Sequence, residues 1–477
     1  MEQIVNTLNS IIWSPALIAL CLGAGLYFSI RTRFLQVRRV GEMVRLMLSG
    51  SSSEAGVSSF QALAMSLSGR IGIGNIAGVA TAIAFGGPGA VFWMWVVAFF
   101  GASTAYVEST LAQIYKEKDD SGRYRGGPAY FIEKAMGQKW YAWLFAVVTV
   151  IATGFLLPGV QANGIASSMS NAWGIPPSAT AAAVVVGLGF IVLGGVKRIA
   201  RFAEVVVPFM ALAYILIALV IMLLNITAVP EMFGLIFRSA FGMEAGMGAV
   251  LGLAIEWGVK RGIYSNEAGQ GTGPHHAAAA EVSHPAKQGF VQAFSVYVDT
   301  LLVCSATAFM ILSTGMYNVA NPEGGMIVEA LPGIEAGPGF AQYAVESVLP
   351  GWGAGFVAVA LLFFAFTTIL AYYYMAETNI TFINRKIHRP WMVFALRLGL
   401  LAAVTFGAVR TAEMAWTLGD IGVGLMAWLN IIAILILQKP ALLALRDYEG
   451  QQAAGQEPVF DPEALGIRNA DFWRRKD

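Results

Sequence analysis

The chain is poor in charged residues and in cysteine. Only 12% of its 477 residues are Asp, Glu, Lys or Arg, roughly half the share that is usual in globular domains. The formal net charge of +1 offers no basic surface for a nucleic-acid partner. Both cysteines, Cys21 and Cys304, lie in apolar runs, so we expect buried thiols without a disulfide. With four histidines and no clustered acid, base or metal-ligand motif, the sequence argues against an enzyme with a resident cofactor.

What the chain has in abundance is apolar sequence. Apolar residues make up 57% of it and the mean hydropathy is +0.64. Arg31 and Arg33 follow the first apolar run where a signal peptide would have a small-residue cleavage site, so we expect a retained helix. Each of the following runs is near the length of about 20 residues that a bilayer requires. The eleven predicted spans are 11–30, 60–84, 89–114, 140–168, 178–196, 203–224, 239–257, 289–314, 352–380, 391–409 and 413–437.

Basic residues predict the orientation of these spans. Most of the 30 Lys and Arg residues fall in loops on alternate sides, while the opposite loops hold only Arg238 and Arg410. The positive-inside rule then places the N-terminus outside and the C-terminus in the cytoplasm of a plasma (inner) membrane. Segment 33–48 alternates apolar residues with arginines and is typical of an amphipathic helix in the interface. The polar tail 449–477 is expected to be flexible.

Two of the predicted spans are interrupted by glycine. Segment 68–75 reads SGRIGIGN and segment 242–248 reads GMEAGMG, five spans later. Unwound membrane backbone survives only where protein or a water-filled cavity satisfies it, and broken helices form the binding sites of many transporters. Close helix packing through small residues is the alternative. The spacing predicts an extra N-terminal helix and interfacial helix (1–50), two inverted five-helix repeats (51–237 and 238–440) and a tail (441–477).

Several motifs carry a family resemblance over about residues 10–440. They are SGRIGIGNIAGVATAIAFGGPGAVFWMW (68–95), RGGPAYF (125–131), KRGIYSNEAGQGTGP (260–274), DTLLVCSATA (299–308) and FAFTTILAYYY (364–374). In these motifs the chain resembles the alanine or glycine:cation symporter family. The resemblance implies an all-α polytopic membrane protein with the leucine-transporter fold, ten core helices in two inverted halves. It also implies import of alanine, glycine, serine or D-alanine, usually with sodium.

The resemblance suggests where substrate and sodium bind. Exposed backbone N–H groups at a broken helix can hold a carboxylate, and hydroxyl and carbonyl oxygens suit a hard cation. Asn75 could instead cap freed backbone, Gln161 could make a helix–helix hydrogen bond, and Tyr372 could serve packing. The hydroxyls of Thr367 and Thr368 could instead bond to the preceding turn of their own helix, which the sequence alone favours. The expected substrate residues are Gly72, Gly74, Asn75, Gln161, Gly246, Gly248 and Tyr372, and the expected sodium ligands are Ser68, Ile71, Thr367 and Thr368.

Three charged residues are candidates for coupling or gating. Asp299 lies within a predicted span, where an acid is functional by default; it could bind a cation, take a proton or pair with Arg70. Arg70 departs from the family pattern and leaves the sodium stoichiometry open. Glu267 could form an ion pair with Lys260 or Arg261 at an inner gate. A proton-coupled transporter of the same fold is the alternative function, whereas scattered single polar residues do not line a channel.

Overall fold

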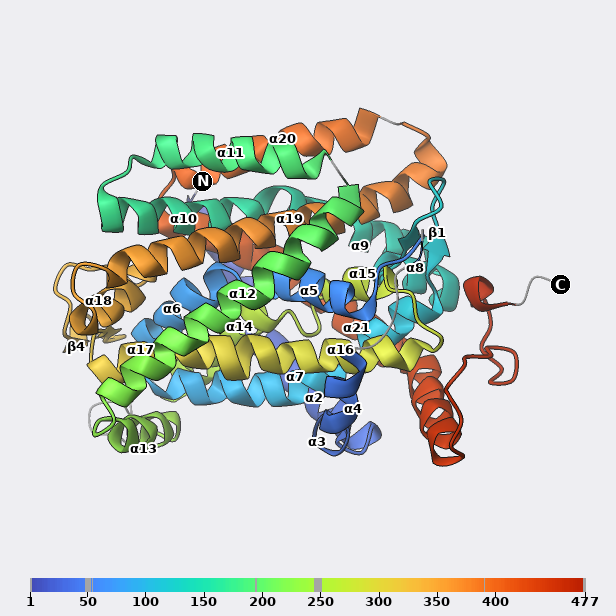
Figure 1. Cartoon of the computed structure of the whole chain (residues 1–477), viewed down its shortest axis with the longest axis horizontal. Helices are drawn as coiled ribbons and strands as arrows, with labels where there is room; N and C mark the ends of the chain where they lie inside the picture. Colours follow the sequence, from blue (N-terminus) through green and yellow to red (C-terminus); the bar gives the residue numbers. More distant parts are fainter. Residues whose placement is uncertain are drawn as a thin grey trace.

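The computed structural model describes residues 2–47, 53, 55–193, 195–243, 251–389 and 391–474. Within them the protein is a bundle of long helices, most of them running along the long axis of the molecule (Figure 1). Eight helices are long and apolar enough to cross a membrane, and a bent pair makes a ninth span. The pairs α1–α2, α9–α10 and α16–α17 each count as one of the eight. The fold class is therefore an all-α polytopic membrane protein.

The elements of the first half follow the predicted spans closely. They are α1 (Glu2–Ile12), α2 (Pro15–Arg31), α3 (Leu35–Arg38), α4 (Val40–Met47), α5 (Ser59–Arg70), η1 (Gly74–Gly78), α6 (Val79–Gly86), α7 (Gly89–Ile114), β1 (Glu117–Lys118), β2 (Tyr124–Arg125), α8 (Pro128–Phe131), η2 (Ile132–Met136), α9 (Lys139–Ile151), η3 (Ala152–Leu156), α10 (Leu157–Trp173), α11 (Pro177–Val192), α12 (Gly195–Leu224) and α13 (Val229–Ala240). Here η1, η2 and η3 are π-helical turns.

The second half contains the longest helices. Its elements are α14 (Leu251–Asn266), α15 (Gly273–Ala278), α16 (Pro285–Tyr297), the π-helical turn η5 (Val298–Cys304), α17 (Ser305–Thr314), β3 (Asn318–Ala320), β4 (Met326–Glu329), α18 (Pro338–Val348), α19 (Gly353–Ile387), α20 (Trp391–Ala408), α21 (Ala412–Ala453) and η6 (Asp471–Trp473). The two short hairpins, β1–β2 and β3–β4, are antiparallel.

One predicted span is interrupted where the sequence indicated. Helix α5 ends at Arg70, the chain passes through residues 71–73, and helix resumes in η1 and α6. The two parts are bent by 53°. We call α5, η1 and α6 the first broken helix. Nearly all of its residues between Ala62 and Ala84 are buried, so the freed backbone lies inside protein, as a break within a membrane span requires.

The seventh predicted span, 239–257, ends too early. Its residues 244–250 lie outside the described residues, but α14 (Leu251–Asn266) continues beyond the predicted end, and α15 follows after a non-helical segment, 267–272. We call α14 and α15 the second broken helix. Gly269 and Gly271 have φ of +87° and +80°, a conformation that glycine adopts without steric cost, and this is why the helix breaks here. Gly246 and Gly248 lie outside the described residues.

The loops that were predicted to share one side do lie together. Lys197 donates to the carbonyl of Ser53 over 2.7 Å, and the Ser53 hydroxyl donates to Glu281 over 2.6 Å. The Tyr124 hydroxyl donates to Glu281 over 2.6 Å. We call this end of the molecule the basic end. The opposite end carries α13, α18 and the β3–β4 hairpin, on the left of Figure 1.

At the basic end the two broken helices are tied together. Val57, just before α5, forms a parallel β-bridge with Ala280, just after α15. The amide of Val57 donates to the carbonyl of Ala279 over 2.9 Å, and the amide of Glu281 donates to the carbonyl of Val57 over 2.8 Å. The structure is therefore closed at the basic end.

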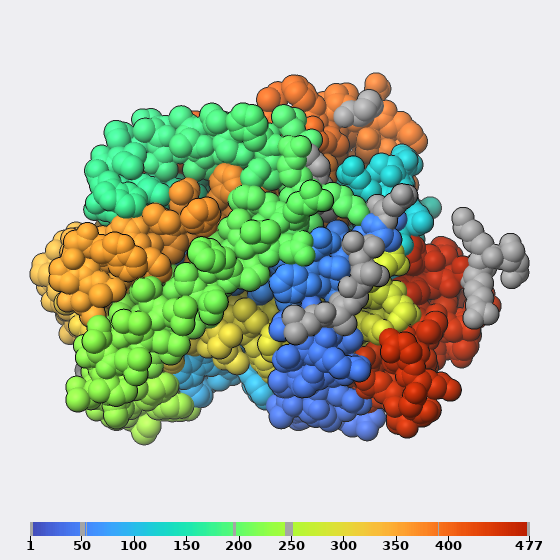
Figure 2. Space-filling view, in the orientation of Figure 1, coloured from blue at the N-terminus to red at the C-terminus, as the bar shows by residue number. Residues whose placement is uncertain are grey.

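The tail is ordered against this closed end, contrary to the expected flexibility. Helix α21 continues to Ala453, and Phe460, Ile467 and Ala470 are buried. Trp473 donates from its indole to the carbonyl of Gln113 over 2.9 Å. Figure 2 shows the red C-terminal segment beside the blue N-terminal helices at this end. Its apolar side chains bury surface that a flexible tail would leave in water. The sequence-based prediction missed them because the composition of the segment is mostly polar.

Candidate functional site

The break of the first broken helix is satisfied by side chains. The amide of Gly72 donates to Asn75 Oδ1 over 2.8 Å, and the amide of Ile73 donates to Gln161 Oε1 over 2.9 Å. A Cβ on Gly72 would lie 2.5 Å from Thr368 Oγ1 and 2.7 Å from Gln161 Oε1. Glycine is therefore required at position 72, because side chains from α10 and α19 occupy the place of a Cβ.

Two of the four expected sodium ligands meet at this break. The Thr368 hydroxyl lies 3.2 Å from the carbonyl oxygen of Ile71, and it also donates to Phe364 in its own helix over 2.9 Å. The hydroxyl of Thr367 donates to Phe364 and that of Ser68 to Met65, each within its own helix. The structure thus brings Thr368 to Ile71 and leaves Thr367 and Ser68 engaged locally.

Gln161 and Tyr372 form one wall beside the break. Gln161 is buried on α10, and the Tyr372 phenol lies against it from α19. On the other side, a Cβ on Gly74 would lie 3.2 Å from the Tyr264 ring and 3.3 Å from the Ser265 Cα. The space around Gly72 and Gly74 is therefore narrow, and it is shared by α10, α14 and α19.

A buried polar centre joins three helices next to the break. Asn75 Nδ2 donates to Asp299 Oδ1 over 2.7 Å, and Ser265 Oγ lies 3.0 Å from both Asp299 oxygens. Thr300 Oγ1 donates to Asp299 Oδ2 over 2.7 Å. Both ends of the Asn75 side chain are therefore bound by protein, as the capping interpretation has it. Asp299 links the first broken helix to α14 and η5.

Arg70 is buried, but it does not form an ion pair with Asp299. Its Nη1 donates to the carbonyl of Gln292 over 3.2 Å and to the Ser295 hydroxyl, both on α16. No carboxylate lies within 4.0 Å of the guanidinium in the part of the chain that the structure describes. Its Nε and Nη2 have no hydrogen-bond partner there. The charge is thus held by α16 and directed towards the interior, not towards lipid.

The expected ion pair between Glu267 and Lys260 or Arg261 is also absent from the described residues. Both basic side chains contact Asp420 on α21 instead, Lys260 Nζ at 2.9 Å and Arg261 Nη2 at 2.5 Å from Oδ2. They lie on α14, before the break, whereas Glu267 lies at the break itself. The guanidinium of Arg261 also lies 4.5 Å from the centre of the Trp416 ring. This cluster therefore ties α14 to α21.

The sequence analysis missed Glu108, which holds the break of the second broken helix. Its carboxylate accepts from the amides of Gly269 and Gly271, each over 3.2 Å, and from Asn430 Nδ2 over 2.7 Å. The side chain is fully buried on α7. An acid inside a predicted span was the available signal, and it was applied only to Asp299.

A polar cavity leads from the opposite end to the break. Its volume is about 550 Å³, and Ile73 lies at its inner limit. Residues lining it include Asn163, Ser167, Glu335, Gln342 and Trp416. The segment 316–346, expected to be either a lid or a surface loop, supplies part of this wall. Among the described lining residues, Ile73 at the unwound segment is the one that belongs to a broken helix.

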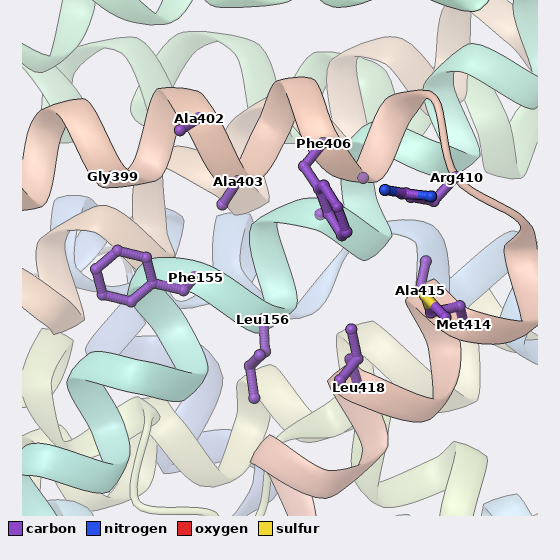
Figure 3. A pocket seen from close by; sticks show the side chains of 12 residues that line it. Phe155, Leu156, Gly399, Ala402, Ala403, Phe406, Arg410, Met414, Ala415 and Leu418 are labelled. Atoms are coloured by element: carbon purple, nitrogen blue, oxygen red, sulfur yellow. The ribbon is translucent and has the colours of Figure 1, made fainter. Parts of the chain in front are cut away.

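A second cavity, of about 420 Å³, is apolar and lies away from the break. It is lined by η3, α10, α20 and α21, with Phe155, Phe406 and Leu418 around it and Arg410 at one end (Figure 3). Such a lining suits hydrocarbon rather than a zwitterion. The polar cavity is therefore the better access route for a small polar solute.

The chain is similar to known proteins over nearly its whole length. Residues 1–462 match the model of the sodium:alanine symporter family. A putative sodium/proton-dependent alanine carrier of Bacillus subtilis is 63% identical over 100% of this chain and 98% of its own length. The sodium/proton-dependent alanine carrier of Bacillus sp. PS3 is 56% identical over 90% and 97%.

More distant matches agree in fold. A sodium/alanine symporter of Methanococcus maripaludis is 37% identical over 91% of this chain and 94% of its own length. A solved manganese transporter of Eremococcus coleocola shares the fold with a TM-score of 0.53 at 14% identity, over 89% of this chain and 88% of that one. The broken helices, the buried polar centre and the full-length match agree: this chain belongs to the sodium:alanine symporter family.

Proposed function

We propose that the protein imports small neutral amino acids, alanine and glycine above all and also D-alanine or serine, together with sodium. The observation that carries this is the contact between the Thr368 hydroxyl and the carbonyl of Ile71 at the break of the first broken helix. Two oxygens from different helices at an unwound segment are the beginning of a sodium site. Ser68 and Thr367 complete it when their hydroxyls turn from their own helices.

The amino acid binds beside this site, between Gly72, Gly74, Gln161 and Tyr372. Backbone amides at the break hold the carboxylate once Asn75 and Gln161 release them. The narrow space around Gly74 admits the methyl group of alanine and excludes larger side chains by overpacking. Gly246 and Gly248, expected at the second break, remain proposed contacts of the substrate next to α14.

Transport proceeds by alternating access. The N-terminus lies outside and the C-terminus in the cytoplasm. The polar cavity then opens to the outside, and the β-bridge at the basic end closes the route to the cytoplasm. The halves 51–237 and 238–440 act as inverted repeats that move against each other around the fixed site. Sodium binding at Ile71 and Thr368 stabilises the outward-open arrangement, because it draws α5 and α19 together.

The test is uptake of labelled alanine by proteoliposomes that contain the purified protein. An inward sodium gradient should drive accumulation at least tenfold above the level with choline on both sides. Leucine in tenfold excess should compete weakly, and glycine should compete strongly. Equal alanine accumulation with and without sodium, measured in the same vesicles, would refute sodium coupling and favour the proton-coupled alternative.

That alternative is supported by two observations. The Bacillus relatives at 63% and 56% identity are described as sodium/proton-dependent carriers. A buried acid, Glu267, also lies at the break of the second broken helix without a hydrogen bond to its carboxylate. The two modes use different groups, so one protein can support both.

A further inference from the structure

Glu267 directly follows the last residue of α14 and has an unusual backbone conformation. Its φ is +57°, in the left-handed region that disfavours any residue with a Cβ. Helices that end in this way usually have glycine there, and this segment has glycines two and four residues later. A glutamate in such a strained backbone conformation points to a role for the side chain itself.

The Glu267 carboxylate is buried without a hydrogen-bond partner. The residue is 1% exposed, and neither Oε1 nor Oε2 has a partner among the described residues. The Thr272 side chain lies alongside, outside hydrogen-bonding geometry. Glu267 Oε2, the Ala371 methyl and the Met375 methyl all lie within 3.5 Å of where a Cβ on Gly69 would stand. The carboxylate therefore lies beside Gly69 of the first broken helix and close to methyl groups of α19.

The surrounding charges compensate this carboxylate only in part. The titratable groups that interact with it are Arg70, Glu108, Asp299, Tyr264 and Tyr372. Among them only Arg70 is a cation, and its nearest contacts are on α16. Asp299 and Glu108 each accept three or more hydrogen bonds from N–H or O–H donors. Glu267 accepts none, so its ionised form is the least stabilised of the three acids.

We propose that Glu267 takes up and releases the proton that accompanies the amino acid when no sodium gradient is present. This proposal rests on the proposed transport function and names the group that carries its proton-coupled mode. A sodium ion needs several oxygen ligands, and the methyl groups around Glu267 do not supply them. A proton needs only the carboxylate oxygen, and binding it removes a buried charge.

The proton balance is simple. On the outer side, hydronium gives a proton to a Glu267 oxygen, which forms an O–H bond and leaves water. On the inner side, the O–H bond breaks and water takes the proton. Because Glu267 lies at the break that joins α14 to α15, neutralising it changes the free energy of the segment that must move. The step needs no further reactant, and it uses a site separate from Thr368 and Ile71.

The experiment uses proteoliposomes with a pH dye inside, in sodium-free choline buffer. Added alanine should acidify the lumen of vesicles that hold the unaltered protein, and an inward proton gradient should drive alanine accumulation. Glu267→Gln should lower both signals at least tenfold while alanine exchange, which requires no net proton movement, continues. Glu256→Gln is the matched control, since Glu256 lies on the same helix but is partly exposed; it should leave both signals unchanged.

Each of the other outcomes contradicts either this proposal or the proposed function. Proton-driven accumulation that survives in Glu267→Gln overturns the proposal. Sodium-driven uptake without alanine-evoked acidification in the unaltered protein also overturns it, and leaves the proposed function intact. Absence of alanine uptake on either gradient refutes the proposed function itself. If Glu267→Gln does not fold, Glu267→Asp keeps a carboxyl group and should shift the pH of half-maximal proton-driven uptake; an unshifted profile contradicts the proposal.

Discussion

Thr368 on α19 and Ile71 at the end of α5 are joined by a contact of 3.2 Å between a hydroxyl and a carbonyl oxygen. The residues are nearly 300 positions apart in sequence, and the contact crosses the break of the first broken helix. It places an oxygen of each helix where a cation would bridge them. The contact therefore provides a direct way to test the sodium site.

Thr368→Val should raise the sodium concentration for half-maximal alanine uptake about tenfold. Valine keeps the volume but removes one oxygen from a site with few ligands, and tenfold corresponds to about 1.4 kcal/mol. Sodium titration of uptake in proteoliposomes measures the effect. Thr405→Val is the control, because that hydroxyl is exposed on α20 and donates to Leu401 in its own helix. Unchanged sodium activation would mean that Thr368 is not a ligand.

Glu108→Gln should destabilise the second broken helix by about 1–3 kcal/mol. The amide keeps one acceptor, so one of the amides of Gly269 and Gly271 loses its partner and faces an NH₂ group in a buried place. Thermal unfolding in detergent should show a lower midpoint, and alanine uptake should require more substrate. Glu413→Gln, exposed in the first turn of α21, should change neither. Equal midpoints for Glu108→Gln and the unaltered protein would contradict this role.

Asp420→Asn should be among the more damaging single changes, at about 3 kcal/mol. It leaves the buried charges of Lys260 and Arg261 without their carboxylate, and breaking a buried ion pair in this way is costly. Adding Lys260→Met should recover part of the loss, since it removes one unpaired charge. Thermal unfolding of the single and double variants measures this. A double variant less stable than Asp420→Asn alone would show that Asp420 does not compensate Lys260.

Lys116, beyond the end of α7, should make stability depend on pH. Burial lowers the pKa of Lys116 from 10.5 to about 7, against the opposing effect of the Glu281 charge. Between these values the unfolded chain holds a proton that the folded protein has released. The free energy of unfolding should therefore rise with pH across this window, by at most about 1.4 kcal/mol per pH unit.

The comparison with Lys116→Met isolates that effect, because all other titrating groups are shared. The difference in melting temperature, unaltered protein minus variant, should become more positive between pH 7 and pH 9. Lys139→Met, exposed at the start of α9, should give a difference that does not vary with pH. A difference for Lys116→Met that is constant across this range would indicate that the amine stays charged in the folded protein.

Local sequence was sufficient for the first broken helix and insufficient for the second. At 68–75, glycines and Asn75 interrupt an otherwise apolar span, so composition alone marks the break. In the second, α14 carries Lys260 and Arg261, and these charges led the end of the helix, from residue 258 on, to be predicted as a loop. Those charges are tolerated because Asp420 and the ring of Trp416 compensate them, and these partners are far away in the sequence.

The partners of the buried charges could not be predicted for the same reason. Arg70 and Asp299 were identified as functional candidates from their apolar surroundings, and Glu267 from the nearby Lys260 and Arg261; both kinds of signal are local information. Which groups they contact depends on how α16, η5 and α14 pack, and the sequence gives no measure of that. Asp299 therefore bonds to Asn75 and Ser265 where an ion pair with Arg70 was one expectation.

Amide hydrogen exchange at the β-bridge between Val57 and Ala280 reports how often the basic end opens. The amides of Val57 and Glu281 are hydrogen-bonded only while the two broken helices are tied, so each becomes exchangeable with deuterium when they separate. Their exchange rates should match each other and differ from those of helix interiors. Slower exchange with sodium and faster exchange with alanine added would time the conformational cycle without any label on the protein.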